Sequence, residues 1–302
     1  MEIEMVTYSA PGKIFLFGEH AVVYGEPAIA CAIDLRARVT VQKHSEVLIT
    51  SELGKGKDKH PYVSKAIEKM GELTRFDGAR VTIDSEIPVS SGLGSSAAVT
   101  IATLAALNEE FGVGLSKEKV AKLGYSVEKD VQGAASPTDT YVSTIGGVVL
   151  MPDGNRLRNL DCEIVVGNTG KISSTKTLVQ QVRALRDRYP GVIQPIFHSI
   201  GNLAKKGEIL VEKEDYSAIG ELMNVNQGLL ESLGVGCAEL STLIYAARGA
   251  GALGVKLTGA GGGGCMVALA DKAHVERITS AIESVGGVAI KTKITEIGVR
   301  RE

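Results

Sequence analysis

Residues 88–99 read PVSSGLGSSAAV, a run in which two glycines and four serines precede a helix-forming stretch. Gly92 and Gly94 carry no Cβ and can adopt positive φ, so the backbone can come close to a ligand. Ser95 and Ser96 place hydroxyl groups where the helix predicted over Ala97–Phe111 would begin. Because the free N–H groups and the positive dipole end of a helix start attract anions, this stretch predicts a phosphate-binding loop.

The glycine-serine stretch differs from the better-known phosphate-binding motifs. The P-loop pattern G-x-x-x-x-G-K-[ST] and the protein-kinase signatures H-R-D and D-F-G are absent from the sequence. The pattern G-x-G-x-x-A does occur at Gly92, Gly94 and Ala97, so a dinucleotide-binding oxidoreductase is a rival. In that fold the glycines directly follow the first strand, whereas SEIPVSS separates the strand predicted at Val81–Asp84 from Gly92. A plain turn would be the simplest interpretation if the stretch stood alone.

Two further segments share its character. Residues 256–265 read KLTGAGGGGC and lie between short apolar runs that are typical of buried strands, which disfavours a flexible linker. Five glycines between two core strands indicate that the backbone there packs closely against another part of the protein or a ligand. Residues 10–25 read APGKIFLFGEHAVVYG and place Lys13, Glu19 and His20 in an otherwise apolar, hairpin-like segment.

Bulk composition excludes several classes of partner. The formal net charge is −2, aromatic residues make up 4% and Trp is absent, so neither a nucleic acid nor an anionic membrane is expected as a partner. No apolar run approaches the ~20 residues that a membrane span needs. The start MEIEM lacks the apolar core of a signal peptide, and the four scattered cysteines form no C-x-x-C pair. A cytoplasmic protein with reduced thiols is expected.

The distribution of elements predicts an α+β protein with two lobes and a boundary near residues 160–170. The first half reads as strands broken by helices, residues 173–250 read as a helical block, and the end is rich in strands again. Among the predicted strands are Val6–Ser9, Lys13–Phe17, Ile29–Ile33, Arg38–Gln42, Ile145–Met151 and Thr295–Val299.

Four charged residues could carry chemistry, and each has a bland alternative. Glu128, near the end of a predicted helix, could hold Mg²⁺, although spacing alone favours a solvated surface glutamate. Asp139 lies in S-P-T-D (136–139), which resembles a capping box with proline at the first helical position. For Lys13 and His20, a snorkelling lysine and a satisfied core histidine are commoner than catalytic groups. Their interest comes from the glycine-rich segments nearby.

The three segments together resemble the motifs of the GHMP kinases, the family of galactokinase, homoserine kinase, mevalonate kinase and phosphomevalonate kinase. P-G-K-x-x-L-x-G-E-H, P-V-x-S-G-L-G-S-S-A-A and K-L-T-G-A-G-G-G-G-C occur in the order typical of the family, and the resemblance covers essentially the whole chain. It implies a two-lobed fold: a ribosomal-protein-S5-like α/β lobe over 1–165 that binds ATP, and a ferredoxin-like α+β lobe over 166–302. ATP and the acceptor would bind in the cleft between the lobes.

Within the family, GEHAVVYG (18–25) and VQGAASPTDT (131–140) look like the compact members that phosphorylate the C5 hydroxyl of mevalonate, early in isoprenoid precursor synthesis. The resemblance implies Asp139 as the base with Lys13 beside it, Ser96 and Glu128 as Mg²⁺ ligands, and residues 261–264 as a brace for the phosphate loop. The residues implied at the mevalonate site are Lys13, Glu19, His20, Asp139 and Thr175. The residues implied around the ATP phosphates are Pro88, Val89, Ser90, Ser91, Gly92, Leu93, Gly94, Ser95, Ser96, Ala97 and Ala98.

Several alternatives stay open at this point. Lys13 could activate the acceptor hydroxyl while Asp139 only orients it. The acceptor could be phosphomevalonate, homoserine or the 3-hydroxyl of mevalonate, and a non-catalytic nucleotide-binding regulator could use the same scaffold. The resemblance also suggests a homodimer.

Overall fold

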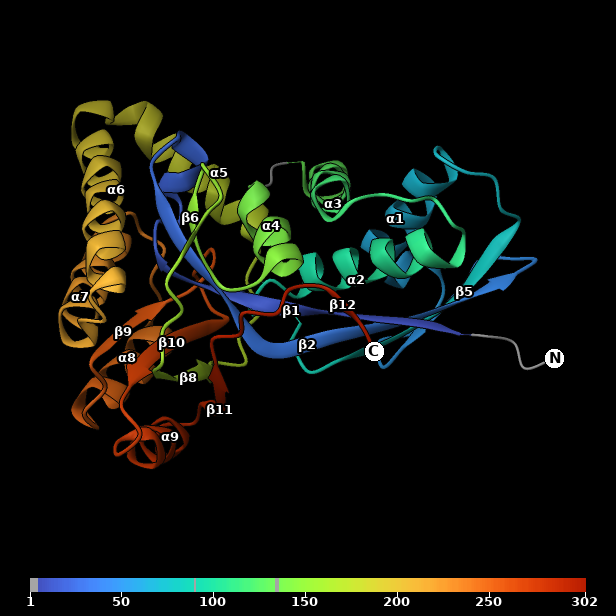
Figure 1. Cartoon of the computed structure of the whole chain (residues 1–302). Coiled ribbons are helices and arrows are strands. Elements are labelled where there is room, and N and C mark those ends of the chain that lie inside the picture. The colour runs from blue at the N-terminus through green and yellow to red at the C-terminus, as the bar shows by residue number, and fades with distance from the viewer. Residues whose placement is uncertain (1–4, 90, 134–135) are drawn as a thin grey trace.

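The computed structural model describes residues 5–89, 91–133 and 136–302. In this part of the chain one sheet has eight strands and a second has four, and helices pack against both (Figure 1). This is the α+β organisation predicted from the sequence.

The large sheet is built around two long antiparallel strands, β1 (Val6–Phe17) and β2 (Ala28–His44). The sequence predicts each as two shorter strands, which is wrong. The ladder continues past Pro11 because the register shifts between Pro11 and Gly12, an irregularity that tolerates the missing proline N–H. The remaining strands of this sheet are β3 (Leu48–Ser51), β4 (Gly54–Lys55), β5 (Gly78–Ser85), β6 (Val148–Met151), β7 (Asn155–Leu157) and β12 (Arg300–Arg301).

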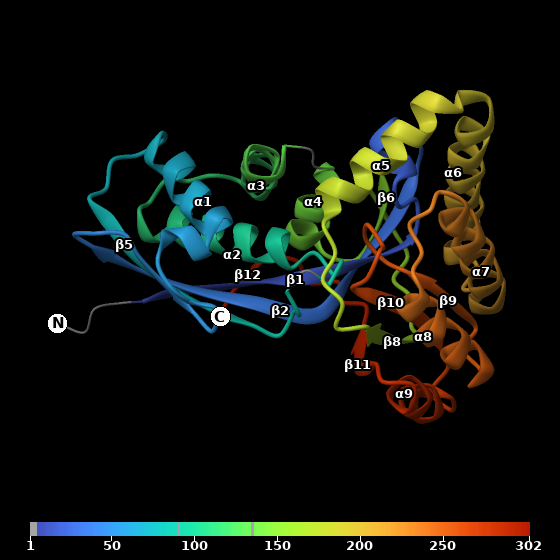
Figure 2. The same cartoon turned by 180° about the vertical axis from the view of Figure 1, so that it is seen from behind.

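Helix α2 (Ser95–Glu110) is the central helix of the first lobe and packs across β1 and β2. Every residue from Thr100 to Leu107 is buried, as expected for a helix that is apolar or small on all sides. Both views show α2 and its neighbouring helices on this face of the sheet (Figures 1 and 2). Besides α2 they are α1 (Pro61–Gly71), α3 (Lys117–Gln132) and α4 (Pro137–Ile145).

The second sheet is antiparallel in the order β11-β8-β10-β9. Its strands are β8 (Glu163–Asn168), β9 (Gly254–Leu257), β10 (Cys265–Ala270) and β11 (Val288–Lys293). Helices α8 and α9 pack on it, α7 packs on β9, and α6 reaches β1 and β2 of the large sheet. The helices of this half are α5 (Thr175–Arg188), α6 (Pro190–Glu212), α7 (Tyr216–Ser232), α8 (Ala238–Gly249) and α9 (Val275–Ser284).

One buried apolar cluster runs through both sheets, joining Phe17 and Ile29 to Val211 of α6 and Val267 of β10. The two lobes therefore share a core. The last strand β12 also returns to the large sheet beside β1, while β8 begins the second sheet. The division of the chain at residue 165 stays a prediction.

Two further strand predictions, for residues 295–299 and 145–151, are wrong in whole or in part. Residues 295–299 form no ladder: the Thr295 carbonyl accepts from the Gly147 N–H at 2.8 Å, and the Val299 N–H donates to the Thr144 carbonyl at 3.1 Å. Between them the Arg36 guanidinium donates to the carbonyls of Ile297 and Gly298 at 3.2 and 2.7 Å. The predicted strand Ile145–Met151 begins only at Val148, since α4 continues to Ile145 and two glycines with positive φ turn the chain.

Candidate active site

A cavity of about 710 Å³ lies where the two lobes meet. Its walls come from β1, the glycine-serine loop before α2, helices α3 and α4, the start of α5 and the loop between β9 and β10. The three sequence motifs, far apart in the chain, therefore line one cavity.

The glycine-serine loop takes the conformation that its glycines allow. Gly92 and Gly94 have φ of 82° and 76°, and Gly94 is the residue immediately before α2. A Cβ at Gly92 would lie 2.4 Å from the carbonyl oxygen of Thr258, and one at Gly94 would lie 2.9 Å from Cγ of Lys13. Gly94 has no side chain to cap the helix, so the first N–H groups of α2 stay available to an anion.

The predicted nucleotide-binding residues divide into a lining group and a supporting group. Ser90 lies outside the described residues. Leu93, Ala97 and Ala98 are fully buried beneath the loop, and Pro88 is half-buried beside it. The residues that line the cavity are Val89, Ser91, Gly92, Gly94, Ser95 and Ser96.

The third motif packs directly against this loop. The Cys265 N–H donates to the Ser91 carbonyl at 2.9 Å, and a Cβ at Gly264 would lie 2.8 Å from the same oxygen. A Cβ at Gly259 would lie 2.7 Å from Cα of Gly92. The two segments therefore touch backbone to backbone, which explains the glycines in both.

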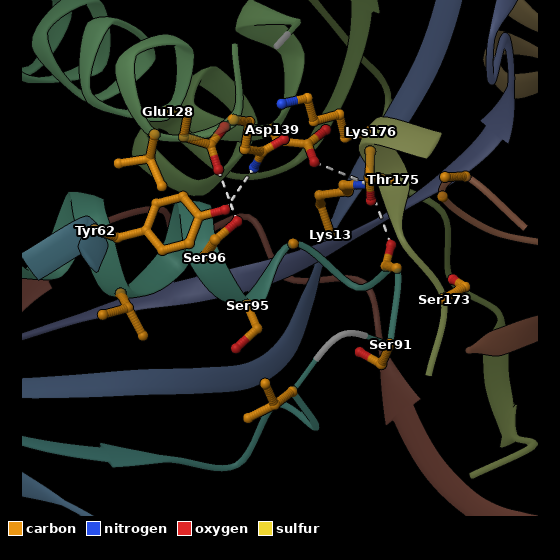
Figure 3. A pocket seen from close by; sticks show the side chains of 18 of the residues that line it. Lys13, Tyr62, Ser91, Ser95, Ser96, Glu128, Asp139, Ser173, Thr175 and Lys176 are labelled. Atoms are coloured by element: carbon orange, nitrogen blue, oxygen red, sulfur yellow. Dashed lines mark hydrogen bonds and ion pairs between the residues drawn. The ribbon is translucent and has the colours of Figure 1, made fainter. Parts of the chain in front are cut away.

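Lys13 and Asp139 form an ion pair at 3.2 Å on the cavity wall (Figure 3). The Lys13 amine also donates to the Gly92 carbonyl at 3.2 Å, and its side chain is only 3% exposed, so the snorkelling interpretation is wrong. The capping role at α4 belongs to Ser136, whose Oγ accepts from the Thr138 N–H at 3.2 Å. The Asp139 carboxylate, 30% exposed in the first turn, is thus free to face Lys13 and a ligand.

Glu128 and Ser96 face each other beside this pair, with Ser96 Oγ donating to Glu128 Oε1 at 2.7 Å. Glu128 is 3% exposed, so the solvated-surface interpretation is wrong: α3 turns this side chain inward toward α2. Burial first, and the charge of Asp139 second, raise the pKa of Glu128 to about 7, against the effects of Ser96 and Lys13. Neighbouring carboxylates and a hydroxyl are hard oxygen donors that fit Mg²⁺, which would relieve this repulsion.

The turn after β1 carries Glu19 and His20, which both line the cavity. His20 has φ 61° and ψ −48°, and the Ala21 N–H donates to the Glu19 carbonyl at 2.7 Å, so His20 is the centre of a γ-turn with positive φ. Such a conformation costs about 1–3 kcal/mol and persists only where the surroundings hold it.

The side chain of His20 is held as well. Its Nε2 lies 3.0 Å from the Ala260 carbonyl, and burial lowers its pKa. The imidazole is therefore neutral near pH 7, and Nε2 carries the hydrogen because a carbonyl only accepts. Glu19 pairs with Lys256, a residue of the third motif to which sequence reasoning gave no role.

Another part of the cavity wall is formed by the start of α5. Thr175 is its first residue, and Ser174 caps the helix by accepting from the Thr177 N–H at 3.3 Å. Sequence reasoning missed the neighbouring Lys176 and also Tyr62, whose hydroxyl accepts from Gln132 Nε2 at 2.9 Å. No motif marks these side chains, because only the folded chain brings them to the cavity.

Comparison with known proteins places this arrangement in a family. The sequence model of the GHMP kinases N terminal domain matches residues 61–147, and that of the GHMP kinases C terminal domain matches residues 208–287. The chain belongs to the GHMP kinase family. The predicted two-lobed GHMP kinase fold is thereby confirmed, and the chain is a kinase that transfers a phosphoryl group to an alcohol. Kinase family membership implies ATP as the donor.

Relatives within the GHMP kinases cover almost the whole chain. It is 44% identical to "Mevalonate kinase" of Thermococcus sibiricus and 45% identical to that of Thermococcus onnurineus, with 98% of each chain covered in both cases. Among solved structures, the Methanococcus jannaschii mevalonate kinase has a TM-score of 0.84 at 27% identity, covering 98% of this chain and all of that one. The L. major mevalonate kinase in complex with R-mevalonate has a TM-score of 0.84 at 26% identity, covering 96% of each chain.

Proposed function

We infer that this GHMP kinase transfers the γ-phosphoryl group of ATP to the C5 hydroxyl of mevalonate, giving 5-phosphomevalonate and ADP. The observation that carries the phosphoryl-transfer chemistry is the Lys13–Asp139 ion pair, which lies in one cavity with the glycine-serine loop at the start of α2. The acceptor is inferred from the relatives, which are named mevalonate kinases and include a structure with R-mevalonate.

The residues suit a reaction in which positioning and charge do most of the catalysis. The N–H groups of residues 94–96 are proposed to hold the phosphates. Asp139 is proposed to accept the proton of the C5 hydroxyl as the new O–P bond forms and the bond to the ADP oxygen breaks. Lys13, 3.2 Å from Asp139, adds positive charge where the transferred group carries negative charge.

Ser96 and Glu128 are proposed to hold Mg²⁺ with the nucleotide. The support is their 2.7 Å contact and the raised pKa of Glu128, which burial first and the charge of Asp139 second keep partly protonated near neutral pH. When bound, the ion supplies positive charge to the phosphate oxygens. A buried, ionised glutamate lowers the stability of the fold unless a cation lies beside it. The presence of Glu128 here therefore fits a site that binds a cation.

On the acceptor side, Glu19, His20 and Thr175 are proposed to contact mevalonate, since all three line the same cavity as Asp139. The wall there also includes Val22 and Val23, which suit the carbon skeleton of a small acceptor.

A panel of acceptors with ATP tests this proposal. Mevalonate, phosphomevalonate, homoserine and galactose are offered separately, ADP release is followed, and ³¹P NMR of the product identifies the phosphorylated oxygen. We expect the highest kcat/KM for mevalonate and a phosphate ester at C5. A preference for another alcohol, or a product carrying phosphate on the 3-hydroxyl, would replace mevalonate C5 as the acceptor position. No ADP release with any of the four would favour a nucleotide-binding regulator.

A homodimer and a cytoplasmic location stay predictions. No helix among the described residues is both long and apolar enough to cross a bilayer. Size-exclusion chromatography with light scattering measures the oligomeric state directly.

A further inference from the structure

Lys256 is a fully buried cation on β9, a strand of the second sheet. Its amine pairs with the carboxylate of Glu19 and also donates to the carbonyls of Leu257 at 2.7 Å and Phe15 at 3.4 Å. Glu19 belongs to the turn after β1 in the large sheet, so this ion pair joins the two lobes at the cavity wall.

Asn226 on α7 binds the other oxygen of the same carboxylate. Its Nδ2 donates to Glu19 Oε2 at 3.3 Å, and the residue is fully buried. Its Oδ1 is buried without a hydrogen-bond partner among the described residues. Because a buried polar atom left unpaired is costly, the orientation that serves Glu19 is kept at the expense of this oxygen.

The residue that follows Glu19 depends on this network. His20 is the centre of the positive-φ turn closed by the Glu19 carbonyl, and its side chain bonds to Ala260 in the loop after β9. Residues 19 and 20 are thus held from the second lobe through both side chains. A strained conformation of this kind is retained only where neighbouring groups over-determine it.

We propose that Lys256 and Asn226 are positioning residues for the acceptor: they fix the Glu19 carboxylate and thereby the turn that directs His20 into the acceptor side of the cavity. This inference rests on the proposed function. A buried ion pair is often no more stabilising than well-packed apolar side chains of similar volume. The ion pair lies at the cavity wall next to a strained turn, which indicates that it positions Glu19 and His20 and does not mainly stabilise the fold.

Asn226→Ala tests the proposal, with Asn224→Ala as its matched control. Asn224 lies on the same helix and ties it to the same strand, accepting from the Val255 N–H at 3.0 Å, without contact to Glu19. Losing a hydrogen bond to a charged group corresponds to about a tenfold effect or more. We expect Asn226→Ala to raise the acceptor KM about tenfold with the ATP KM changed less than about twofold, and Asn224→Ala to leave both KM values near wild type.

The double variant Glu19→Gln/Lys256→Met removes both charges with nearly unchanged side-chain volume. Because Glu19 is itself a proposed acceptor contact, the double variant is compared with Glu19→Gln alone. We expect its melting temperature to equal or exceed that of the wild type while its acceptor KM rises about tenfold or more above that of Glu19→Gln, a separation that a purely structural network would not give. The double variant matching Glu19→Gln in acceptor KM would overturn the proposal. So would Asn226→Ala matching Asn224→Ala in acceptor KM, acceptor and ATP KM rising together, or failure of both network variants to fold.

These outcomes are separate from the proposed acceptor. KM is taken for whichever alcohol the wild-type enzyme phosphorylates best in the panel, so a different acceptor revises the proposed function and leaves this comparison intact. If the wild type phosphorylates none, the dissociation constant of mevalonate, measured by calorimetry on the same variants, replaces KM.

Discussion

Replacing Glu128 with glutamine should stabilise the ligand-free enzyme at pH 8. The pKa of Glu128 is raised from 4.5 to about 7, chiefly by burial. Since one pKa unit corresponds to about 1.4 kcal/mol, the ionised carboxylate costs the folded state about 3 kcal/mol. Glutamine is nearly isosteric and carries no charge, so Glu128→Gln removes this cost while keeping a group that Ser96 can bond.

The sign and the pH window follow from proton binding. Between pH 4.5 and about 7 the folded enzyme binds more protons than the unfolded chain, so its free energy of unfolding falls as the pH rises. The stability penalty is small at the acid end of this window and complete above about pH 7. The difference between Glu128→Gln and wild type should therefore grow from about 1 kcal/mol at pH 5 to about 3 kcal/mol at pH 8.

Urea unfolding at pH 5 and pH 8, without nucleotide or divalent metal, measures this difference. Glu118→Gln is the control on the same helix: Glu118 is exposed, and its hydrogen bond with Ser116 lowers its pKa. A carboxylate whose pKa is lower in the folded state than in the unfolded chain stabilises the fold at pH values above its unfolded pKa. Glu118→Gln removes that contribution, so this control should not gain stability at pH 8. If Glu128→Gln is no more stable than wild type at pH 8, or its advantage is equal at both pH values, the ionised Glu128 carboxylate does not destabilise the fold as we infer.

Three further changes test the site and the lobe junction. Asp139→Asn should lower kcat by about 10²–10⁴ with little change in the ATP KM, measured by steady-state ADP release; an active variant would remove its role as base. Ser96→Ala should raise the Mg²⁺ concentration needed for half-maximal activity, and an unchanged Mg²⁺ titration would contradict its role as a ligand. Arg36→Met should lower the free energy of unfolding by about 2–4 kcal/mol, because Arg36 is buried and holds the carbonyls of Ile297 and Gly298, whereas exposed Arg38→Met should cost under about 1 kcal/mol. Equal urea midpoints for the two arginine variants would contradict that reasoning.

The sequence predicts which segments meet at the cavity better than it predicts the state of each side chain. The glycines of residues 92–94 and 256–265 require close backbone contact, and the two segments do touch. The burial of Glu128 could not be predicted, because spacing shows that α3 has an apolar face but not which element covers its polar edge. Lys256 lies within a recognised motif, yet its partner Glu19 is 237 residues away and no local pattern links them.

Strand boundaries failed for a related reason. Local β propensity predicts 295–299 as a strand, but the main chain there bonds at single points to Gly147 and Thr144, and the Arg36 side chain donates to two of its carbonyls. Conversely, local rules predict that the strand ends at Pro11. The residues before and after Pro11 both pair with β2, so β1 continues past it. In both cases a distant partner outweighs the local preference.

The segment 256–265 touches both parts of the proposed site. Gly259 and Cys265 contact the glycine-serine loop, proposed to hold the phosphates, backbone to backbone at Gly92 and Ser91. Its first residue, Lys256, pairs with Glu19, on the proposed acceptor side. Phosphoryl transfer requires the attacking and leaving oxygens to be nearly in line, and small misplacements are costly. Because one short segment touches both the loop and the turn, the same strand-loop-strand unit helps to set the position of each. This explains why a glycine-rich segment without catalytic groups lies at the centre of the site.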